Sequence, residues 1–505
     1  MGHRSRMQSV ELLDEVRPPD EPSSRAADGA RSRRLRMLWP VAAAVALALV
    51  GTQAVIAARD RSATGRIQAL PGVVRGIGPD VSPLWQVDER DADYLDRSVT
   101  VDGTVIGVRT APDGSQRIEA RDVSTGSGRW SAPLRGPDPE LALRGGAASR
   151  SLCQSVPTAP GDHAALVACL GSDAAVSVGR SGRTTYVRAP VRSHVVVIDT
   201  ADGHVVADQP APAAIAFTTL PGLVVLGTPA DDGHAALTAQ DPLTGARAWR
   251  FVSPAPDIAP AGDVAGFRLF RLGDEIGLQE ANRQVTLLSA AGGVARARTR
   301  VLDGTPVVVG SDRLELLSGF AEARPLTTIV RPGRPDAYVP GYLLARSVDD
   351  GSLGNVEITY GSLVQAWDSS SGKLLWQADG PVAGPAVVLR GLVFSMGWSG
   401  AGEVRAFDGR TGALVWSVHV GSYDETQTLL TDGTSIVVAN APAPGEGSGT
   451  IEGFALDTGV RLWTTRTTAL LGTLTVRGHV LVSASAAASV VLGSLKDERV
   501  GVAGP

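Results

Sequence analysis

The feature that most constrains the fold is a short pattern that recurs along the chain: an Asp, a Gly four positions later, and a Trp four positions after that. Its clearest copy, VRAFDGRTGALVWSV, contains Asp408, Gly412 and Trp416. The Asp carboxylate can accept backbone N–H groups at the start of a turn, and the Gly supplies the positive φ that closes it. The Trp then lies on one face of a returning strand, because strand side chains alternate with a period of two. The pattern therefore predicts a β-hairpin with an indole at a fixed position.

Other copies of the pattern are intact, degraded or shifted. The intact copies are Asp122/Gly126/Trp130, Asp241/Gly245/Trp249 and Asp368/Gly372/Trp376. The weaker copies are Asp199/Gly203, with Ala207 at the Trp position; Gly459/Trp463, with Ala455 at the Asp position; and a poor copy at Ser289/Gly293.

The spacing of these copies predicts a propeller. Successive motif glycines lie about 40–50 residues apart, except for two intervals of nearly 80, and repeats of this length that carry strands and a Trp are typical of propellers. Each long interval is either a blade with an insertion or a blade whose motif is too degraded to see. Short apolar runs alternate with turn residues to the end of the chain, without a helical period. We predict an all-β propeller of about eight four-stranded blades, with seven as the alternative, over residues 81–500.

Closure of the ring makes a specific demand on the two ends of this domain. After Trp463 the sequence offers only three short strands, near residues 473–476, 480–485 and 490–495. Near the other end, Leu84–Val87 with Trp85 resembles the Trp strand of a repeat that has lost its first three strands. We predict that this segment completes the last blade, which removes exposed sheet edges.

The N-terminal part of the chain predicts a membrane anchor. Residues 37–58 carry no charged side chain, and a helix of that length spans about 33 Å, enough to cross a bilayer. Arg31, Arg33, Arg34 and Arg36 on its N-terminal side favour a cytoplasmic, disordered tail over residues 1–36 and an exported propeller. A cleaved signal peptide is the rival, but its apolar region is usually 7–15 residues long. We therefore expect a single-pass protein of the cell membrane, with residues 59–80 as a linker to the extracytoplasmic propeller.

Two cysteines, Cys153 and Cys169, lie in the first long interval between motif copies. In an exported domain an even pair of cysteines predicts a disulfide, with two buried free thiols as the alternative. The bridge would hold an insertion, residues 144–188, that departs from the repeat.

The copies AFDGRTGALVW and AWDSSSGKLLW resemble the tryptophan-docking repeat of the pyrroloquinoline-quinone-like propeller superfamily. The superfamily includes quinoprotein alcohol dehydrogenases and the outer-membrane assembly lipoprotein propeller. The resemblance covers about residues 84–495 and implies that the Asp, Gly and Trp of each copy, together with Trp85, are structural and hold the blades together. Enzymes of the superfamily bind the quinone beside a calcium ion, under a disulfide of adjacent cysteines. This chain has no adjacent cysteine pair, so we expect neither the quinone nor calcium.

No other chemistry stands out in the sequence. The seven histidines show no zinc-ligand spacing, no GxSxG nucleophile motif is present, and a formal net charge of −5 gives no indication of nucleic acid. We therefore name no catalytic, cofactor-binding or metal residue. The first hypothesis is a binding or scaffold module with a protein or cell-envelope ligand. The alternatives are a quinone-dependent dehydrogenase and an extracellular sensor that signals to the cytoplasmic tail.

Overall fold

The computed structural model describes residues 52–53 and 62–493, apart from internal gaps. The gaps of five residues or more are 89–93, 141–147, 158–164, 179–183, 255–266, 302–306, 421–427 and 441–447, and the others are shorter. The chain divides into two compact units, Met1–Ala63 and Thr64–Pro505, and the architecture below belongs to the second.

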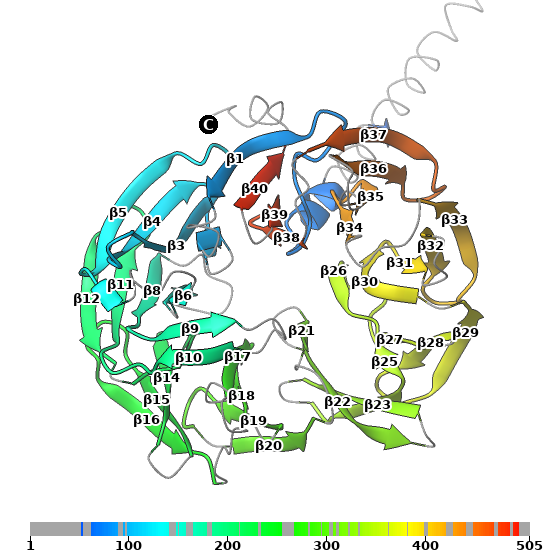
Figure 1. Cartoon of the computed structure of the whole chain (residues 1–505). Coiled ribbons are helices and arrows are strands. Elements are labelled where there is room, and N and C mark those ends of the chain that lie inside the picture. Colours follow the sequence, from blue (N-terminus) through cyan, green and yellow to red (C-terminus); the bar gives the residue numbers. More distant parts are fainter. Residues whose placement is uncertain are drawn as a thin grey trace, which may run out of the picture. The chain divides into compact units, whose positions relative to one another are not determined.

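The described residues form ten sheets, of which nine are consecutive four-stranded antiparallel blades arranged as a ring (Figure 1). In each blade the strands run from the inner side of the ring to its rim, and in the blades that carry a motif Trp this residue lies on the outermost strand.

Blades 1 to 4 come first in the chain. Blade 1 consists of β2 (Val99–Val101), β3 (Thr104–Thr110), β4 (Gln116–Asp122) and β5 (Gly128–Arg135); blade 2 of β7 (Leu152–Val156), β8 (Leu166–Gly171), β11 (His194–Asp199) and β12 (Val205–Pro210); blade 3 of β13 (Ala216–Leu220), β14 (Leu223–Pro229), β15 (Ala235–Gln240) and β16 (Arg247–Val252); blade 4 of β17 (Arg268–Leu272), β18 (Glu275–Gln279), β19 (Gln284–Ser289) and β20 (Ala295–Arg300).

Blades 5 to 9 follow. Blade 5 consists of β21 (Val307–Val309), β22 (Arg313–Ala321), β23 (Arg324–Val330) and β24 (Ala337–Pro340); blade 6 of β25 (Tyr342–Leu343), β27 (Val356–Tyr360), β28 (Leu363–Asp368) and β29 (Leu374–Asp379); blade 7 of β30 (Val382–Leu389), β31 (Leu392–Gly397), β32 (Glu403–Asp408) and β33 (Leu414–His419), with β26 (Arg346–Asp349) added parallel to β30; blade 8 of β34 (Thr428–Thr431), β35 (Ser435–Asn440), β36 (Gly449–Ala455) and β37 (Arg461–Thr467); blade 9 of β38 (Thr473–Arg477), β39 (Val480–Ala484), β40 (Ala488–Gly493) and β1 (Ser82–Asp88).

The all-β propeller is as predicted, but the predicted count of eight blades, or seven, is wrong. The interval between Gly293 and Gly372 contains blade 5, which has lost the motif entirely. The interval between Gly126 and Gly203 contains one blade together with a small three-stranded sheet of β6 (Ala148–Ser149), β9 (Ala175–Val178) and β10 (Thr184–Arg188). The two long intervals therefore have different causes, a hidden blade in one and an insertion in the other.

The predicted closure of the ring is confirmed. Strand β1 pairs antiparallel with β40, and Trp85 stands opposite Val491. The three strands after Trp463 are β38, β39 and β40, as expected. The first strand of the domain thus supplies the rim strand of the last blade, which closes the ring (Figure 1).

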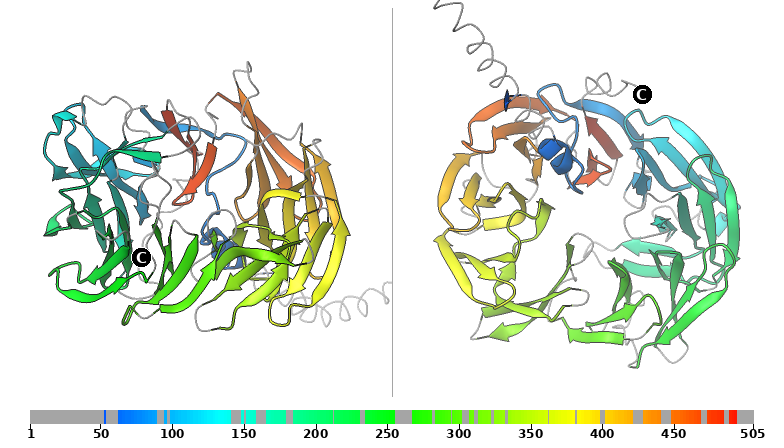
Figure 2. Two further views of the ribbon diagram at one scale, coloured as in Figure 1. Left: turned by 60° about the horizontal axis from the view of Figure 1, so that its bottom comes forward. Right: turned by 180° about the vertical axis from the view of Figure 1, so that it is seen from behind.

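The segment expected as a linker, residues 59–80, is a packed part of the propeller unit from Thr64 onward, with a helical turn that ends at residue 68. Ile67 and Val73 pack into the core of blades 7 and 8, and Val74 and Ile77 pack into that of blades 8 and 9. The Val74 N–H donates to the Thr431 carbonyl at 2.9 Å. The glycines between these aliphatic residues suggested flexibility, yet burial of the aliphatic side chains orders the backbone. Two views from other directions show the segment in blue on the inner side of the ring (Figure 2).

The predicted tail, residues 1–36, lies outside the described residues, and so does the predicted anchor, residues 37–58, except for Thr52 and Gln53. Within the described part of the chain, every helix falls short of the length and apolar content that crossing a membrane requires.

Candidate binding site

The Asp and Gly of the motif build the turn before each rim strand. The Asp408 Oδ1 atom accepts the backbone N–H of Arg410 at 3.0 Å and that of Thr411 at 2.8 Å. Hydrogen bonds to the ionised carboxylate, first of all from the Thr411 hydroxyl, hold the pKa of Asp408 below its usual value. In blade 6, the hydroxyls of two serines act in the same way and lower the pKa of Asp368 to about 2. Gly412 adopts a φ of +75°, which a side chain would strain.

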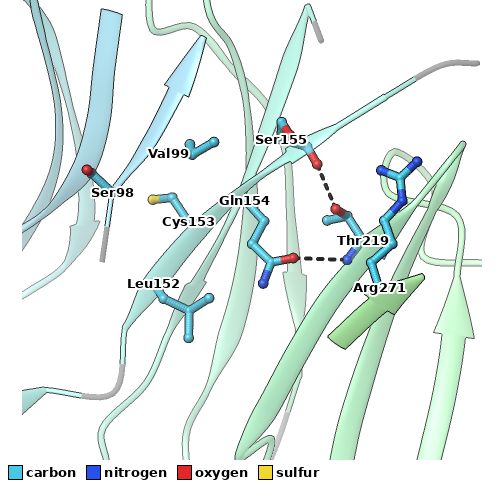
Figure 3. A pocket seen from close by; sticks show the side chains of 8 residues that line it. All are labelled: Ser98, Val99, Leu152, Cys153, Gln154, Ser155, Thr219 and Arg271. Atoms are coloured by element: carbon cyan, nitrogen blue, oxygen red, sulfur yellow. Dashed lines mark hydrogen bonds between the residues drawn. The ribbon is translucent and has the colours of Figure 1, made fainter. Parts of the chain in front are cut away.

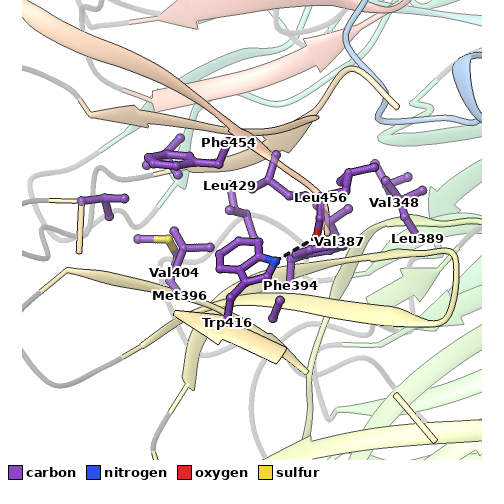
Figure 4. Packing of buried hydrophobic residues seen from close by; sticks show 14 of the residues in the cluster. Val348, Val387, Leu389, Phe394, Met396, Val404, Trp416, Leu429, Phe454 and Leu456 are labelled. Carbon is purple, nitrogen blue, oxygen red and sulfur yellow. Dashed lines mark hydrogen bonds between the residues drawn. The ribbon is translucent and has the colours of Figure 1, made fainter. Parts of the chain in front are cut away.

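The Trp of the motif docks onto the next blade. Trp416 Nε1 donates a hydrogen bond to the Leu456 carbonyl of blade 8 at 2.9 Å, and its ring covers Gly459, where an added Cβ would lie 2.6 Å from the indole (Figure 4). The acceptor is the residue that follows the motif Asp position of the next blade. The same arrangement joins Trp85 to Val123, Trp130 to Thr200, Trp249 to Ala290 and Trp376 to Gly409, at 2.9–3.0 Å.

The interface between blades 2 and 3 departs from this arrangement. Blade 2 has Ala207 at the Trp position, and Gln209 Nε2 donates instead to the carbonyl of Pro242, the residue after Asp241, at 3.0 Å. Gly245 keeps the turn conformation of the motif, with a φ of +71°, but it faces this amide: a Cβ added there would lie 2.9 Å from Gln209 Oε1. Gly245 therefore lies at the contact between blades 2 and 3, but the side chain that it faces is an amide and not an indole.

Trp463 of blade 8 also departs from the docking arrangement. It is only partly buried and packs against the core between blades 8 and 9, close to Gly453 of its own blade. Blade 9 ends in β1 and offers it no motif turn. Trp463 therefore contributes packing without the hydrogen bond that the other motif indoles make.

A pocket of about 480 Å³ lies on the inner strands of blades 1 to 4 (Figure 3). Its lining residues come from the first strand of each blade or the position beside it: Ser98, Val99, Leu152, Cys153, Gln154, Ser155, Thr219 and Arg271. Gln154 Oε1 accepts the Thr219 N–H at 3.2 Å, and the Thr219 hydroxyl donates to the Ser155 carbonyl at 2.6 Å. These bonds tie blades 2 and 3 together on the inner side of the ring. The pocket therefore offers hydrogen-bonding groups and one guanidinium, that of Arg271.

The predicted disulfide between Cys153 and Cys169 is present, with an S–S distance of 2.05 Å. The two cysteines stand directly opposite each other on β7 and β8. The bridge therefore joins the two innermost strands of blade 2, whereas the added sheet of β6, β9 and β10 lies before and after these strands in sequence. Its position corrects the expectation that it holds the insertion, residues 144–188.

The residues of the inner pocket do not fit a quinone beside a calcium ion. Among the described residues, the lining contains neither a carboxylate to hold calcium nor an aromatic ring to stack on a quinone. Across the described residues, no three His, Cys, Asp or Glu side chains gather in a way that could hold a metal. The expectation that the chain binds neither cofactor stays a prediction.

The densest group of charged residues lies between blades 5 and 6 and is buried. The Glu357 carboxylate is fully buried and accepts hydrogen bonds from Arg313, Arg331 and Arg346. Glu315 lies 3.3 Å from Arg313, and burial raises its pKa to about 7. We interpret this group as structural, because the Glu357 carboxylate is fully occupied by partners. Its members are far apart in the sequence, so no local motif could have indicated it.

We predict that Trp416→Ala lowers the free energy of unfolding by about 3–5 kcal/mol, because it removes a buried indole and a hydrogen bond between blades. Urea unfolding measures the change. Leu414→Ala is the matched control, because Leu414 lies on the same strand and is 55% exposed. A loss below about 1 kcal/mol for the Trp variant would argue against docking.

We also predict a pH dependence that originates at Glu315. Its pKa is about 7 in the folded protein and 4.5 in the unfolded chain, so between these values the folded state binds more protons. The free energy of unfolding therefore falls as pH rises through this window, by about 3 kcal/mol at most. Glu315→Gln should flatten the slope of stability against pH, measured by chemical unfolding. Asp379→Asn, at an exposed position, should keep the parent slope, and an unchanged slope in the Gln variant would contradict the assignment.

Comparison with known proteins gives one family match. Residues 342–499, which cover blades 6 to 8 and most of blade 9, match the family model described as outer membrane protein assembly factor BamB. No curated protein matches the chain.

Among similar solved structures, BamB from Moraxella catarrhalis has 16% identity and a TM-score of 0.40, with 82% of this chain and 98% of that chain covered. The quinohemoprotein alcohol dehydrogenase from Comamonas testosteroni has 12% identity and a TM-score of 0.36, with 82% and 77% covered. The C-terminal WD40 domain of Sif2 has 12% identity and a TM-score of 0.40, with 83% and 99% covered.

Proposed function

Since residues 342–499 carry the pyrroloquinoline-quinone-like repeat, we propose that this chain is a non-catalytic, protein-binding scaffold. The propeller is displayed outside the cell and held at the cell membrane by residues 37–58. The uncharged run and its arginine-rich N-terminal flank support this topology. The matching family is named for an assembly factor of outer membrane proteins, which supports a protein partner in the cell envelope.

The observation that carries the proposal is a set of exposed aliphatic side chains on the rim strands of three consecutive blades. We call it the exposed aliphatic band: Leu374, Leu375, Leu414, Val415, Val460 and Leu462, which are 38–59% exposed. Its members come from β29, β33 and β37, the outermost strands of blades 6 to 8, or from the position directly before β37. Exposed apolar side chains that gather in this way mark protein interaction sites.

The band is the one run of three consecutive described blades whose rim strands, counting the position directly before β37, each carry a pair of such side chains, whereas the rim strands of blades 2 and 3 carry single ones, Val206 and Val252. On the rim strand of blade 1, the two positions before Trp130 carry Gly128 and Arg129. On that of blade 3, the two positions before Trp249 carry Arg247 and Ala248. The aliphatic side chains are therefore not needed for the docking of a Trp, and their presence on blades 6 to 8 requires another reason. Contact with a protein partner supplies one.

We predict that a photo-crosslinker in place of Leu414 or Leu462 captures one envelope protein in native membranes. The matched controls place the same crosslinker at Arg129 and Ala248 and should capture no specific partner. Mass spectrometry identifies the adduct, and Leu414→Glu should abolish capture from Leu375, because a charge in the band opposes burial. Equal capture from blades 1 and 3, or none from the band, would overturn the proposal.

A reconstitution experiment distinguishes the hypothesis of a quinone-dependent dehydrogenase from that of a scaffold. We expect that the purified chain, supplied with pyrroloquinoline quinone and calcium, reduces no dye in the presence of small alcohols or sugars. The physical reason is the lining of the inner pocket, which offers no carboxylate. Dye reduction that requires all three of protein, quinone and calcium would contradict the prediction.

A further inference from the structure

The interface between blades 5 and 6 lacks the docked indole that joins blades 6 and 7. In blade 6, Ala366 on the third strand faces blade 7 and pairs with the docked Trp376 on the rim strand. In blade 5, the equivalent residue on the third strand is Ile329, which faces blade 6 and pairs with Ala337. Ala337 therefore occupies the position at which five other blades place a docked indole. Another indole, that of Trp367 on blade 6, packs against Ile329 at a different place in this interface.

A cavity of about 490 Å³ lies where the missing ring would stand. On the side of blade 5 it is lined by Ala337, Tyr338 and residues of the preceding loop, including Arg331 and Arg334. On the side of blade 6 it is lined by Asn355 and by the turn Ser369–Gly372. The cavity is larger than a lone indole ring and leaves room for flanking backbone.

The turn of blade 6 keeps the geometry that receives an indole elsewhere. Gly372 adopts a φ of +67°, close to the +75° of Gly412. A Cβ added at Gly412 would lie 2.5 Å from the ring of Trp376, whereas the nearest neighbour of a Cβ at Gly372 is the Tyr338 carbonyl oxygen at 3.6 Å. The receiving surface is therefore present without its ring.

The hydrogen-bond acceptor is present as well. In the docked interfaces, the indole N–H binds the carbonyl of the residue after the motif Asp position, which in blade 6 is Ser369. Ser369 is 6% exposed and its N–H donates to the Asn355 carbonyl at 2.8 Å. No donor among the described residues binds the Ser369 carbonyl. A buried acceptor beside a cavity favours a ligand that brings a donor.

The rim of the cavity carries charge. Arg331 is engaged by Glu357, and Arg334 is exposed and forms no ion pair with the described residues. Asp336 is partly buried at the same rim. An N–H donor on an aromatic ring would satisfy the Ser369 carbonyl, and the side chains of Arg334 and Asp336 would lie beside the polar backbone that flanks such a ring.

We propose that this cavity binds the tryptophan side chain of a partner polypeptide, with the ring over Gly372 and the indole N–H donating to the Ser369 carbonyl. The partner thus supplies in trans the ring that blade 5 lacks. The cavity and the exposed aliphatic band share no residue, and the binding test uses purified protein, so the two proposals can fail independently.

The test measures binding of N-acetyl-L-tryptophan amide to the purified full chain by calorimetry. We expect saturable binding, no binding of N-acetyl-L-alanine amide, and about tenfold weaker binding of the 1-methylindole analogue, which lacks the donor. Absence of saturable binding, or equal affinity for the methylated analogue, would overturn the proposal. Much tighter binding of free tryptophan than of the amide would also overturn it, because the site would then serve a small molecule.

A variant fills the cavity from within the chain. Ala337→Trp should abolish binding of the amide and raise the melting temperature, because it restores the indole that other blades possess. Ala248→Trp is the matched control, since it adds an indole at an exposed position on the rim strand of blade 3 and should leave binding unchanged. Retained binding in a folded Ala337→Trp protein would contradict the proposal.

Should that variant not fold, the comparison of N-acetyl-L-tryptophan amide with its 1-methylindole analogue still tests the proposal on the parent protein. Crosslinking from Leu414 should not change in the Ala337→Trp variant.

Discussion

The structure depends on a contact that joins five pairs of neighbouring blades: an indole N–H donated to a carbonyl in the turn before the rim strand of the next blade. Each contact adds a hydrogen bond and a buried ring between two neighbouring sheets, in addition to the side-chain packing between them. Three residue types contribute to the contact. The Asp fixes the turn by accepting backbone N–H groups, the Gly lets the ring approach the backbone, and the Trp reaches across. The Asp is replaceable, since Trp416 docks on a turn with Ala455 at that position and Trp249 docks on one with Ser289.

The same three residue types decide how much of the fold can be predicted from the sequence. Where all three residues are present, the hairpin and its partner strand follow from spacing, and the closing strand around Trp85 can be inferred from the strands left over at the end. Blade 5 could not be recognised in the sequence because its hairpin departs from the motif. Its Ile329–Ala337 pair closes a hairpin two residues shorter than the one closed by the Ala366–Trp376 pair of blade 6. The binding surfaces could not be predicted, since the inner pocket combines residues from four blades and Glu357 gathers arginines from distant strands.

The linker shows a different limit of sequence reasoning. Val73, Val74 and Ile77 lie among glycines, a composition typical of flexible connections. The segment is nevertheless held, because each aliphatic side chain finds a place in the cores of blades 7 to 9 and the backbone joins Thr431 and His479 by hydrogen bonds. Composition describes the segment alone, whereas its order comes from the surface against which it packs.

The interface of blades 5 and 6 shows how a propeller can omit one docked ring and remain closed. Burying an indole is a simple way to join two blades, but it also fills the space between them. At this interface Arg313, Arg331 and Arg346 converge on Glu357 from both sides, and Trp367 packs against blade 5 further along the strands. Desolvation makes a buried ion group costly, and removing one partner leaves a buried charge uncompensated. We infer that this group joins the two blades at an interface where no indole is docked. Arg331 belongs to both features, since it binds Glu357 and lines the cavity, so the charges that hold the interface together also shape the space that it leaves open.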